Sequence, residues 1–169
     1  MKIVFSLILI FLILLFQIGI VPHISIDGVF VNLILISILC LSILVSWKSV
    51  LGWIIAGGFF LDFYSNGFLG LSVIALVFSC FFAYFLSRKI FKEKNFVSLL
   101  LVLIPSLFSY RLLIILLLGV FRGSFIFDYS SFGIWLLYNL VFSVLVFYIS
   151  KYLHNKFFIS KHEKSIPKI

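Results

Sequence analysis

The sequence contains few charged residues. Of its 169 residues only 11% are Asp, Glu, Lys or Arg, and only five are acidic, whereas 64% are hydrophobic and the mean hydropathy is +1.35. A soluble domain of this size would leave large apolar patches in water, so the scarcity of charge excludes an ordinary soluble protein. A bilayer accepts such side chains. The composition therefore indicates an integral membrane protein.

Cysteine and histidine are also scarce. The two cysteines, Cys40 and Cys80, lie in separate apolar runs, which favours small buried hydrophobes over a disulfide or a metal pair. The histidines, His23, His154 and His162, stand in loop-like or tail positions without a cysteine or carboxylate at metal-ligand spacing. We therefore expect no metal ion and no cofactor.

Long apolar runs make up most of the chain. A helix needs about 20 apolar residues to cross the hydrocarbon core, and polar interruptions leave six runs that we predict to be membrane spans: Ile3–Val21, Val29–Trp47, Val50–Tyr64, Phe68–Ser87, Phe96–Phe121 and Phe132–Ser150. We predict an all-α integral membrane protein with six transmembrane helices in one compact bundle over residues 1–150, and a basic cytoplasmic tail over residues 151–169. The turn Ser65-Asn66-Gly67 predicts a helical hairpin of the third and fourth spans, with a re-entrant pair as the alternative.

The distribution of basic residues predicts the orientation. Positive charge accumulates on the cytoplasmic side of membrane proteins, and six spans with both termini in the cytoplasm place every basic residue there except Arg111 and Arg122: Lys2, Lys48, Arg88, Lys89, Lys92, Lys94, Lys151, Lys156, Lys161, Lys164 and Lys168. Topology thus explains the net charge of +8 without a nucleic-acid partner. The tail is either a solvated positive anchor or a segment that lies on anionic membrane lipids.

Two charged residues, Asp62 and Arg111, fall within the predicted spans. A charge at the centre of a membrane helix costs roughly 2.5 to 3.5 kcal/mol on insertion scales, so each of the two needs a physical reason. They lie at similar depths, about 20 Å and about 22 Å from the cytoplasmic starts of their spans. One interpretation is an ion pair between them. The other is that Asp62 faces the outer headgroups while Arg111 snorkels towards them.

Small and polar residues in the same spans indicate close helix packing. Gly52 and Ala56 form a small-xxx-small step, and Gly57-Gly58 removes side chains from the next turn. Asn139, in the last span, should hydrogen-bond to a partner helix. The polar residues Ser106, Ser109, Tyr110 and Asn139 form either one interhelical cluster with Asp62 and Arg111 or a set of separate local hydrogen bonds.

The groups that catalysis needs are largely missing. An intramembrane aspartyl hydrolase requires two carboxylates that share a site, and the other acidic residues on the outer side, Asp27 and Asp128, fall in loops. The motifs of a lipoprotein signal peptidase, a nucleotide-binding loop, a metal-binding His-Glu box and a nucleophile elbow are all absent from the sequence. We therefore expect no catalytic residues and no enzyme activity.

The stretch LGWIIAGGFFLDFYSNGFLGLSVIAL, residues 51–76, resembles the hallmark region of the MreD family of bacterial rod shape-determining membrane proteins. In that family a glycine-spaced helix is followed by an aspartate, a Ser/Gly turn and a Leu-Gly that begins the next helix. The matching positions are Gly52, Gly58, Asp62, Ser65, Gly67, Leu69 and Gly70. The length, the basic loop after the fourth span and Tyr138-Asn139 near the start of the last helix are similar too. Phe68 replaces a proline that often precedes the Leu-Gly.

The resemblance implies a non-catalytic scaffold of the cell-elongation machinery in the bacterial cytoplasmic (inner) membrane. Its implied partners are the bitopic protein MreC, MreB filaments and the peptidoglycan synthases of elongation, the latter two directly or indirectly. The alternative from another class is the substrate-binding membrane subunit of an energy-coupling-factor vitamin transporter, which is also small and usually six-helical. That hypothesis requires a pocket. The residues that would line it are Asp62, Tyr110, Arg111 and Asn139.

Overall fold

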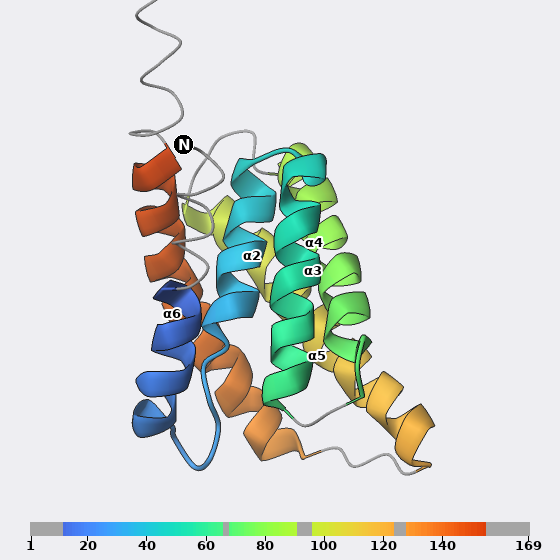
Figure 1. The fold of residues 1–169 in the computed structure, drawn as a ribbon. Coiled ribbons are helices and arrows are strands. Elements are labelled where there is room, and N and C mark those ends of the chain that lie inside the picture. Colours follow the sequence, from blue (N-terminus) through green and yellow to red (C-terminus); the bar gives the residue numbers. More distant parts are fainter. Residues whose placement is uncertain (1–11, 66–67, 91–95, 124–127, 155–169) are drawn as a thin grey trace, which may run out of the picture.

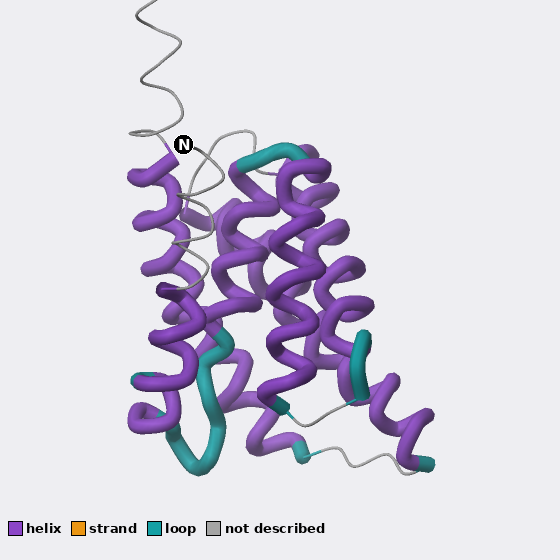
Figure 2. The backbone as a smooth tube through the Cα atoms, viewed as in Figure 1, coloured by secondary structure: helices purple, strands orange, loops and turns teal. Residues whose placement is uncertain are grey.

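The structure is a computed structural model that describes residues 12–65, 68–90, 96–123 and 128–154 (Figure 1). Its named elements are η1 (Val21–Ile24), α2 (Leu33–Leu44), α3 (Trp47–Tyr64), α4 (Leu71–Ile90), α5 (Phe96–Arg122) and α6 (Tyr129–His154), and residues 12–19 are helical as well. Within these ranges there is no β-strand, and helices account for most of the backbone (Figure 2). The predicted all-α fold is therefore confirmed.

Three of the described helices are long and apolar enough to cross a membrane. They comprise Leu71–Lys89 of α4, Phe96–Arg122 of α5 and Tyr129–Tyr152 of α6, which agree with the last three predicted spans to within a few residues. The third predicted span corresponds to α3, which begins three residues earlier than expected, at Trp47. Of the first predicted span, residues 3–11 lie outside the described residues.

The second predicted span, Val29–Trp47, is much longer than the helix found there. Helix α2 covers only Leu33–Leu44, a rise of about 18 Å against a hydrocarbon core of about 30 Å. It starts late because the Asn32 side chain accepts a hydrogen bond from the Leu35 N–H and caps the helix. It ends early because Val45 and Ser46 are extended. Because residues 29–47 are mostly apolar, hydropathy alone did not indicate where α2 begins or ends.

A compact loop precedes α2. Asp27 and Gly28 have φ angles of 49° and 75°, and the flanking residues Ile26 and Val29 exchange backbone hydrogen bonds of 3.2 and 2.8 Å. Positive φ at two successive central residues is the requirement of a type I′ turn, which Asp-Gly satisfies well. The loop therefore folds back and delivers the chain to the start of α2.

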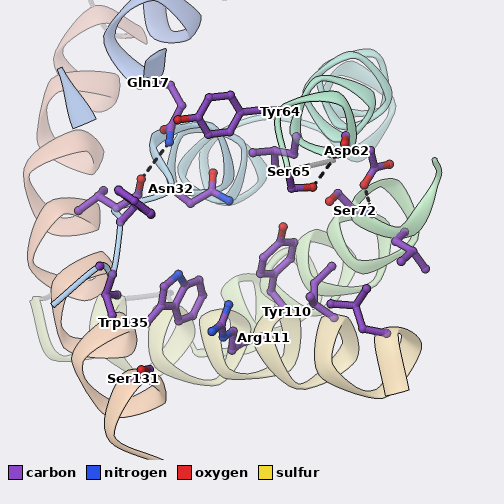
Figure 3. A pocket seen from close by; sticks show the side chains of 18 of the residues that line it. Gln17, Asn32, Asp62, Tyr64, Ser65, Ser72, Tyr110, Arg111, Ser131 and Trp135 are labelled. Carbon is purple, nitrogen blue, oxygen red and sulfur yellow. Dashed lines mark hydrogen bonds between the residues drawn. The ribbon is translucent and has the colours of Figure 1, made fainter. Parts of the chain in front are cut away.

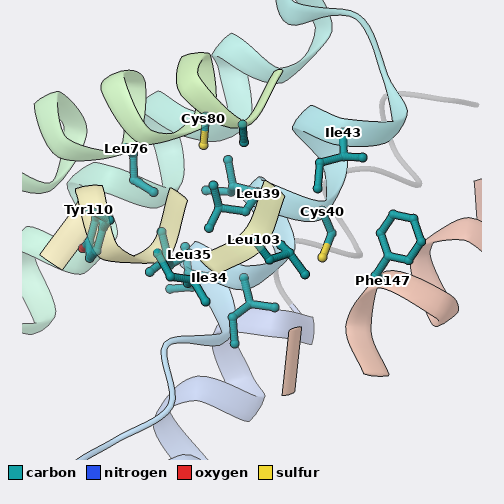
Figure 4. Packing of buried hydrophobic residues seen from close by; sticks show 14 of the residues in the cluster. Ile34, Leu35, Leu39, Cys40, Ile43, Leu76, Cys80, Leu103, Tyr110 and Phe147 are labelled. Atoms are coloured by element: carbon teal, nitrogen blue, oxygen red, sulfur yellow. The ribbon is translucent and has the colours of Figure 1, made fainter. Parts of the chain in front are cut away.

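Helix α2 forms the centre of the bundle because it is apolar on all sides. Leu35, Ile36, Leu39 and Cys40 are fully buried, and α2 packs against α3, α4 and α6. Figure 4 shows α2 side chains meeting Leu76 and Cys80 of α4, Leu103 and Tyr110 of α5, and Phe147 of α6. Both cysteines are free thiols inside this core.

Helices α3 and α4 pack side by side as the predicted hairpin. A Cβ built on Gly58 would lie 2.7 Å from the Cα and 2.9 Å from the backbone nitrogen of Val73 in α4, so the two backbones approach closely at this glycine. Gly57 faces α2, where its Cβ would meet the side chains of Ile34 and Ile38. Gly52 differs from the sequence prediction, because a Cβ there would meet nothing within 4 Å. Close packing therefore uses the Gly57-Gly58 pair.

Helix α6 begins with an exposed aspartate cap. The Asp128 carboxylate accepts hydrogen bonds from the hydroxyl and backbone N–H of Ser130 and from the hydroxyl of Ser131. The hydroxyl groups of Ser131 and then Ser130 lower the pKa of Asp128. The cap therefore stays ionised at neutral pH, where its negative charge faces the positive end of α6.

Candidate functional site

Asp62 closes the α3–α4 hairpin. Its side chain, only 2% exposed, projects from the last turn of α3. Oδ2 accepts a hydrogen bond of 2.7 Å from the Gly70 N–H, and Oδ1 accepts one of 2.8 Å from the Ser72 N–H. The first N–H groups of a helix have no partner within it, so a carboxylate from α3 caps α4 and faces its positive end.

Gly70 is the residue that makes this geometry possible. Its φ of 95° lies in the left-handed region that favours glycine, and this conformation turns the chain into α4 with its N–H directed at Asp62. Ser65 ends α3 on the same side, and its hydroxyl donates a hydrogen bond of 3.4 Å to the Asp62 carbonyl oxygen. Asp62, Ser65 and Gly70 thus form one structural unit. Gly67 lies outside the described residues.

Arg111 does not form the ion pair considered with Asp62. Its guanidinium carbon lies 5.3 Å from the ring centroid of Trp135, a cation–π contact between α5 and α6. Both carboxylate oxygens of Asp62 are already bound to backbone N–H groups. Similar depth along two predicted helices does not determine which partners each charged group finds.

A cavity of about 460 Å³ lies between these two charged residues (Figure 3). Its walls come from the residue 12–19 helix, the loop before α2, the end of α3, the start of α4, and α5 and α6. Figure 3 shows Tyr110 and Arg111 of α5 facing Asp62 and Ser72 across it.

Buried amide side chains hold the loop side of the cavity. The Gln17 side chain donates to the Val31 carbonyl oxygen at 3.1 Å and accepts from the Leu33 N–H at 2.7 Å. Asn139, fully buried in α6, accepts from the Asn32 N–H at 2.8 Å. Together the two amides satisfy an extended backbone segment that has no strand partner.

Tyr138 and Asn139 act at the two ends of the same loop. The Tyr138 hydroxyl donates to the Ile24 carbonyl oxygen, and Asn139 binds the Asn32 N–H. The Asn139 amide nitrogen donates back to the Trp135 carbonyl oxygen at 2.8 Å, within α6. The predicted interhelical role of Asn139 thus corresponds to a helix-to-loop contact.

Sequence reasoning missed several residues that line the cavity. Gln17 is a lone amide in an apolar run, which was a visible signal. Asn32 stands at the boundary of an apolar run and could have been interpreted as a helix cap. Trp135 and Ser72 gave no signal, because an indole among apolar residues and a serine after Leu-Gly are both common in membrane helices.

The separate partners of Asp62 and Arg111 lead to a testable expectation. We expect the losses of stability from Asp62→Asn and Arg111→Gln to add in the double variant within about 0.5 kcal/mol, because residues without shared partners behave independently. Denaturant titration of the purified proteins in detergent would measure this. A double variant that regains more than about 1 kcal/mol would demonstrate a direct coupling.

The two carboxylates on the wall of the cavity have different surroundings. Asp27 and Asp62 both line the cavity, but Asp62 uses both oxygens as a helix cap and Asp27 is exposed. Within the described part of the chain, no three His, Cys, Asp or Glu side chains lie close enough to hold a metal ion. In comparisons with known proteins, no family model, no curated sequence and no solved structure matches this chain.

Proposed function

We propose that this chain is a non-catalytic scaffold of the MreD type in the bacterial cytoplasmic membrane, where it helps to maintain cell shape during wall elongation. The observation that carries the proposal is the contact of Asp62 with the Gly70 and Ser72 N–H groups. It gives a physical reason for the order of residues in the hallmark region, since the aspartate, the turn and the glycine depend on one another. We propose that the role of residues 51–76 is to form the α3–α4 hairpin.

The proposed topology is six spans with both termini in the cytoplasm. Helix α3 begins at the end of the bundle where α4 and α6 end (Figure 1), and these helix ends carry Lys48, Arg88, Lys89 and Lys151. The cavity lies at the opposite end, with Asp62. By the positive-inside rule, the more basic end of the bundle would face the cytoplasm, which agrees with the proposed orientation.

The outward faces of the helices support binding to lipids and to a membrane partner. Large apolar side chains are exposed along α4, α5 and α6, including Phe78, Phe81, Phe108, Leu137 and Val141. Because such a surface is stable only against lipid or another apolar helix, we propose that a bitopic MreC-like protein binds here. MreB filaments and elongation synthases would join the assembly directly or through that partner.

The scaffold proposal is tested by depletion and by copurification. Depletion of the protein in its rod-shaped host should round and widen the cells, and affinity purification in mild detergent should recover a single-span protein. An Asp62→Ala variant that still reaches the membrane should fail to restore the rod shape, because the hairpin is distorted. Unchanged shape in a host that depends on lateral wall growth would contradict the proposal.

The cavity supports one second candidate, the substrate-binding subunit of an energy-coupling-factor vitamin transporter. Its volume of about 460 Å³ falls within the range of about 300 to 1,000 Å³ that is typical of small-molecule sites. The same purification distinguishes the two functions. Recovery of an ATPase pair together with a bound vitamin would replace the scaffold with the transporter subunit.

A further inference from the structure

Arg111 carries a hydrogen-bond donor without a partner. Most buried side-chain nitrogen and oxygen atoms of the described residues have a hydrogen-bond partner. The Arg111 Nε is buried and has none. Buried polar groups in proteins almost always have partners, and a charged group without one is costly. The exception lies on the wall of the cavity.

The charge of Arg111 is also not neutralised within the described chain. No described carboxylate lies within ion-pair distance of it: Asp62 caps α4 through both oxygens, and Asp27 is exposed at the loop. The positive end of α4 already offsets the charge of Asp62. Arg122, which is exposed and also lines the cavity, adds a second positive charge to its wall.

The guanidinium is held in place rather than free to move. It lies over Trp135, whose ring is 6% exposed and stacks on Tyr110 at a centroid distance of 6.2 Å. Figure 3 shows Arg111 directed from α5 into the space between α3, α4 and α6. A fixed guanidinium with free N–H groups matches the geometry of phosphate and carboxylate oxygens.

The cavity has room for more than an oxyanion. Its volume of about 460 Å³ is many times the share of one water molecule in the liquid, about 30 Å³. Apolar side chains form part of its wall, among them Leu61, Leu71, Ile114 and Leu118. A ligand that fills the space would therefore place an apolar portion against these residues.

From these observations we infer that the cavity binds an amphiphilic oxyanion, whose phosphate or carboxylate group is held by Arg111. The ligand could come from the bilayer, as the headgroup region of an anionic phospholipid, or from water, as a small organic phosphate or acid. The inference goes beyond the scaffold role and does not depend on it. A bound oxyanion would complete the hydrogen bonding of Arg111 and supply the missing negative charge.

Ligand binding is tested on the full-length protein with two matched probe pairs. Native mass spectrometry in detergent compares phosphatidylglycerol with diacylglycerol of the same chains, and thermal unfolding compares hexyl phosphate with hexanol. We expect the wild-type protein to prefer the charged member of at least one pair by about tenfold or more, a difference of about 1.4 kcal/mol. Preference within the lipid pair alone identifies a membrane source, and preference within the soluble pair alone identifies a small molecule. Equal binding within both pairs overturns the inference.

Substitutions then locate the binding group. Arg111→Gln should weaken binding of the preferred probe by about tenfold to a hundredfold, as expected for loss of hydrogen bonds to a charged group, and Arg111→Lys should restore part of it. Arg88→Gln is the matched control, because Arg88 also lies over an aromatic ring, 5.0 Å from the Tyr84 centroid, but does not line the cavity. Equal losses at both arginines, or none at Arg111, would overturn the assignment. If Arg111→Gln does not fold, the Arg111→Lys variant and the wild-type preference decide.

Discussion

Replacing Gly58 with alanine is expected to separate α3 from α4 and to lower the free energy of unfolding by about 1 to 3 kcal/mol, the usual cost of overpacking. The added Cβ would lie 2.7 Å from the Cα and 2.9 Å from the backbone nitrogen of Val73. A backbone cannot rotate away as a side chain does, so one helix must shift as a body. That shift would also disturb the Asp62 cap, one helical turn further along α3. Denaturant titration of the purified variant in detergent would measure the loss.

The same helix provides two controls for Gly58. Gly57→Ala should cause a smaller loss, because its Cβ would meet only side-chain atoms, Ile38 Cδ1 at 2.7 Å and Ile34 Cγ2 at 2.9 Å. Gly52→Ala should be close to wild type, since nothing lies within 4 Å of its Cβ. The expected order of loss is therefore Gly58, Gly57, Gly52. If Gly52→Ala were as damaging as Gly58→Ala, helix flexibility rather than backbone contact would explain the glycines.

The helices predicted best from the sequence are those whose ends are marked by polar residues. Helix α5 agrees with its predicted span to within one residue, because charged residues precede it in the sequence and Arg122 ends it. Helix α2 was predicted poorly, because its boundaries fall inside a mostly apolar run, and Asn32 and Ser46 at its ends are hard to distinguish from Ser37 and Ser42 within it. Hydropathy reports whether a residue prefers lipid or core to water, and an extended apolar segment satisfies that preference as well as a helix does.

The sequence predicted which residues meet at the candidate site better than it predicted the contacts between them. Asp62, Tyr110 and Arg111 line one cavity, whereas Asn139, the fourth residue expected there, is not among the residues that line it. Their contacts were not predictable, because the Asp62 cap depends on the φ of Gly70 and on the path of a loop. Part of the loop before α2, residues 29–32, contributes to a wall of the cavity but was hidden within the predicted second span. Contacts between residues so far apart in the sequence can be identified only in the structure.

The hairpin and the cavity both depend on how the few buried polar side chains are hydrogen-bonded. Among the described residues, each buried carboxylate or amide side chain satisfies backbone groups that secondary structure leaves open: Asp62 for α4, and Gln17 and Asn139 for the loop before α2. Arg111 is the exception, since it satisfies no backbone group and faces empty space. The first set of contacts explains the fold, and the exception explains why we assign a ligand to the cavity.

Replacing Asp62 with alanine is expected to have the largest effect of any single polar substitution, a loss of about 2 to 6 kcal/mol. The variant would leave the buried N–H groups of Gly70 and Ser72 without acceptors, at about 1 to 3 kcal/mol each. Asp62→Asn should fall between alanine and wild type, because an amide has one acceptor oxygen and its NH₂ group would face the other N–H donor. Denaturant titration in detergent measures both variants.

Asp128 is the matched control for Asp62. It is also an aspartate at the start of a helix, α6, but it is exposed to water, which can replace its hydrogen bonds to Ser130 and Ser131. Asp128→Asn should therefore cause a much smaller loss than Asp62→Asn. Because the pKa of Asp128 is lowered in the folded protein, its contribution is present above the unfolded pKa and is lost as the pH falls through the folded pKa. A loss at Asp128 equal to that at Asp62 would mean that burial does not strengthen the hairpin cap.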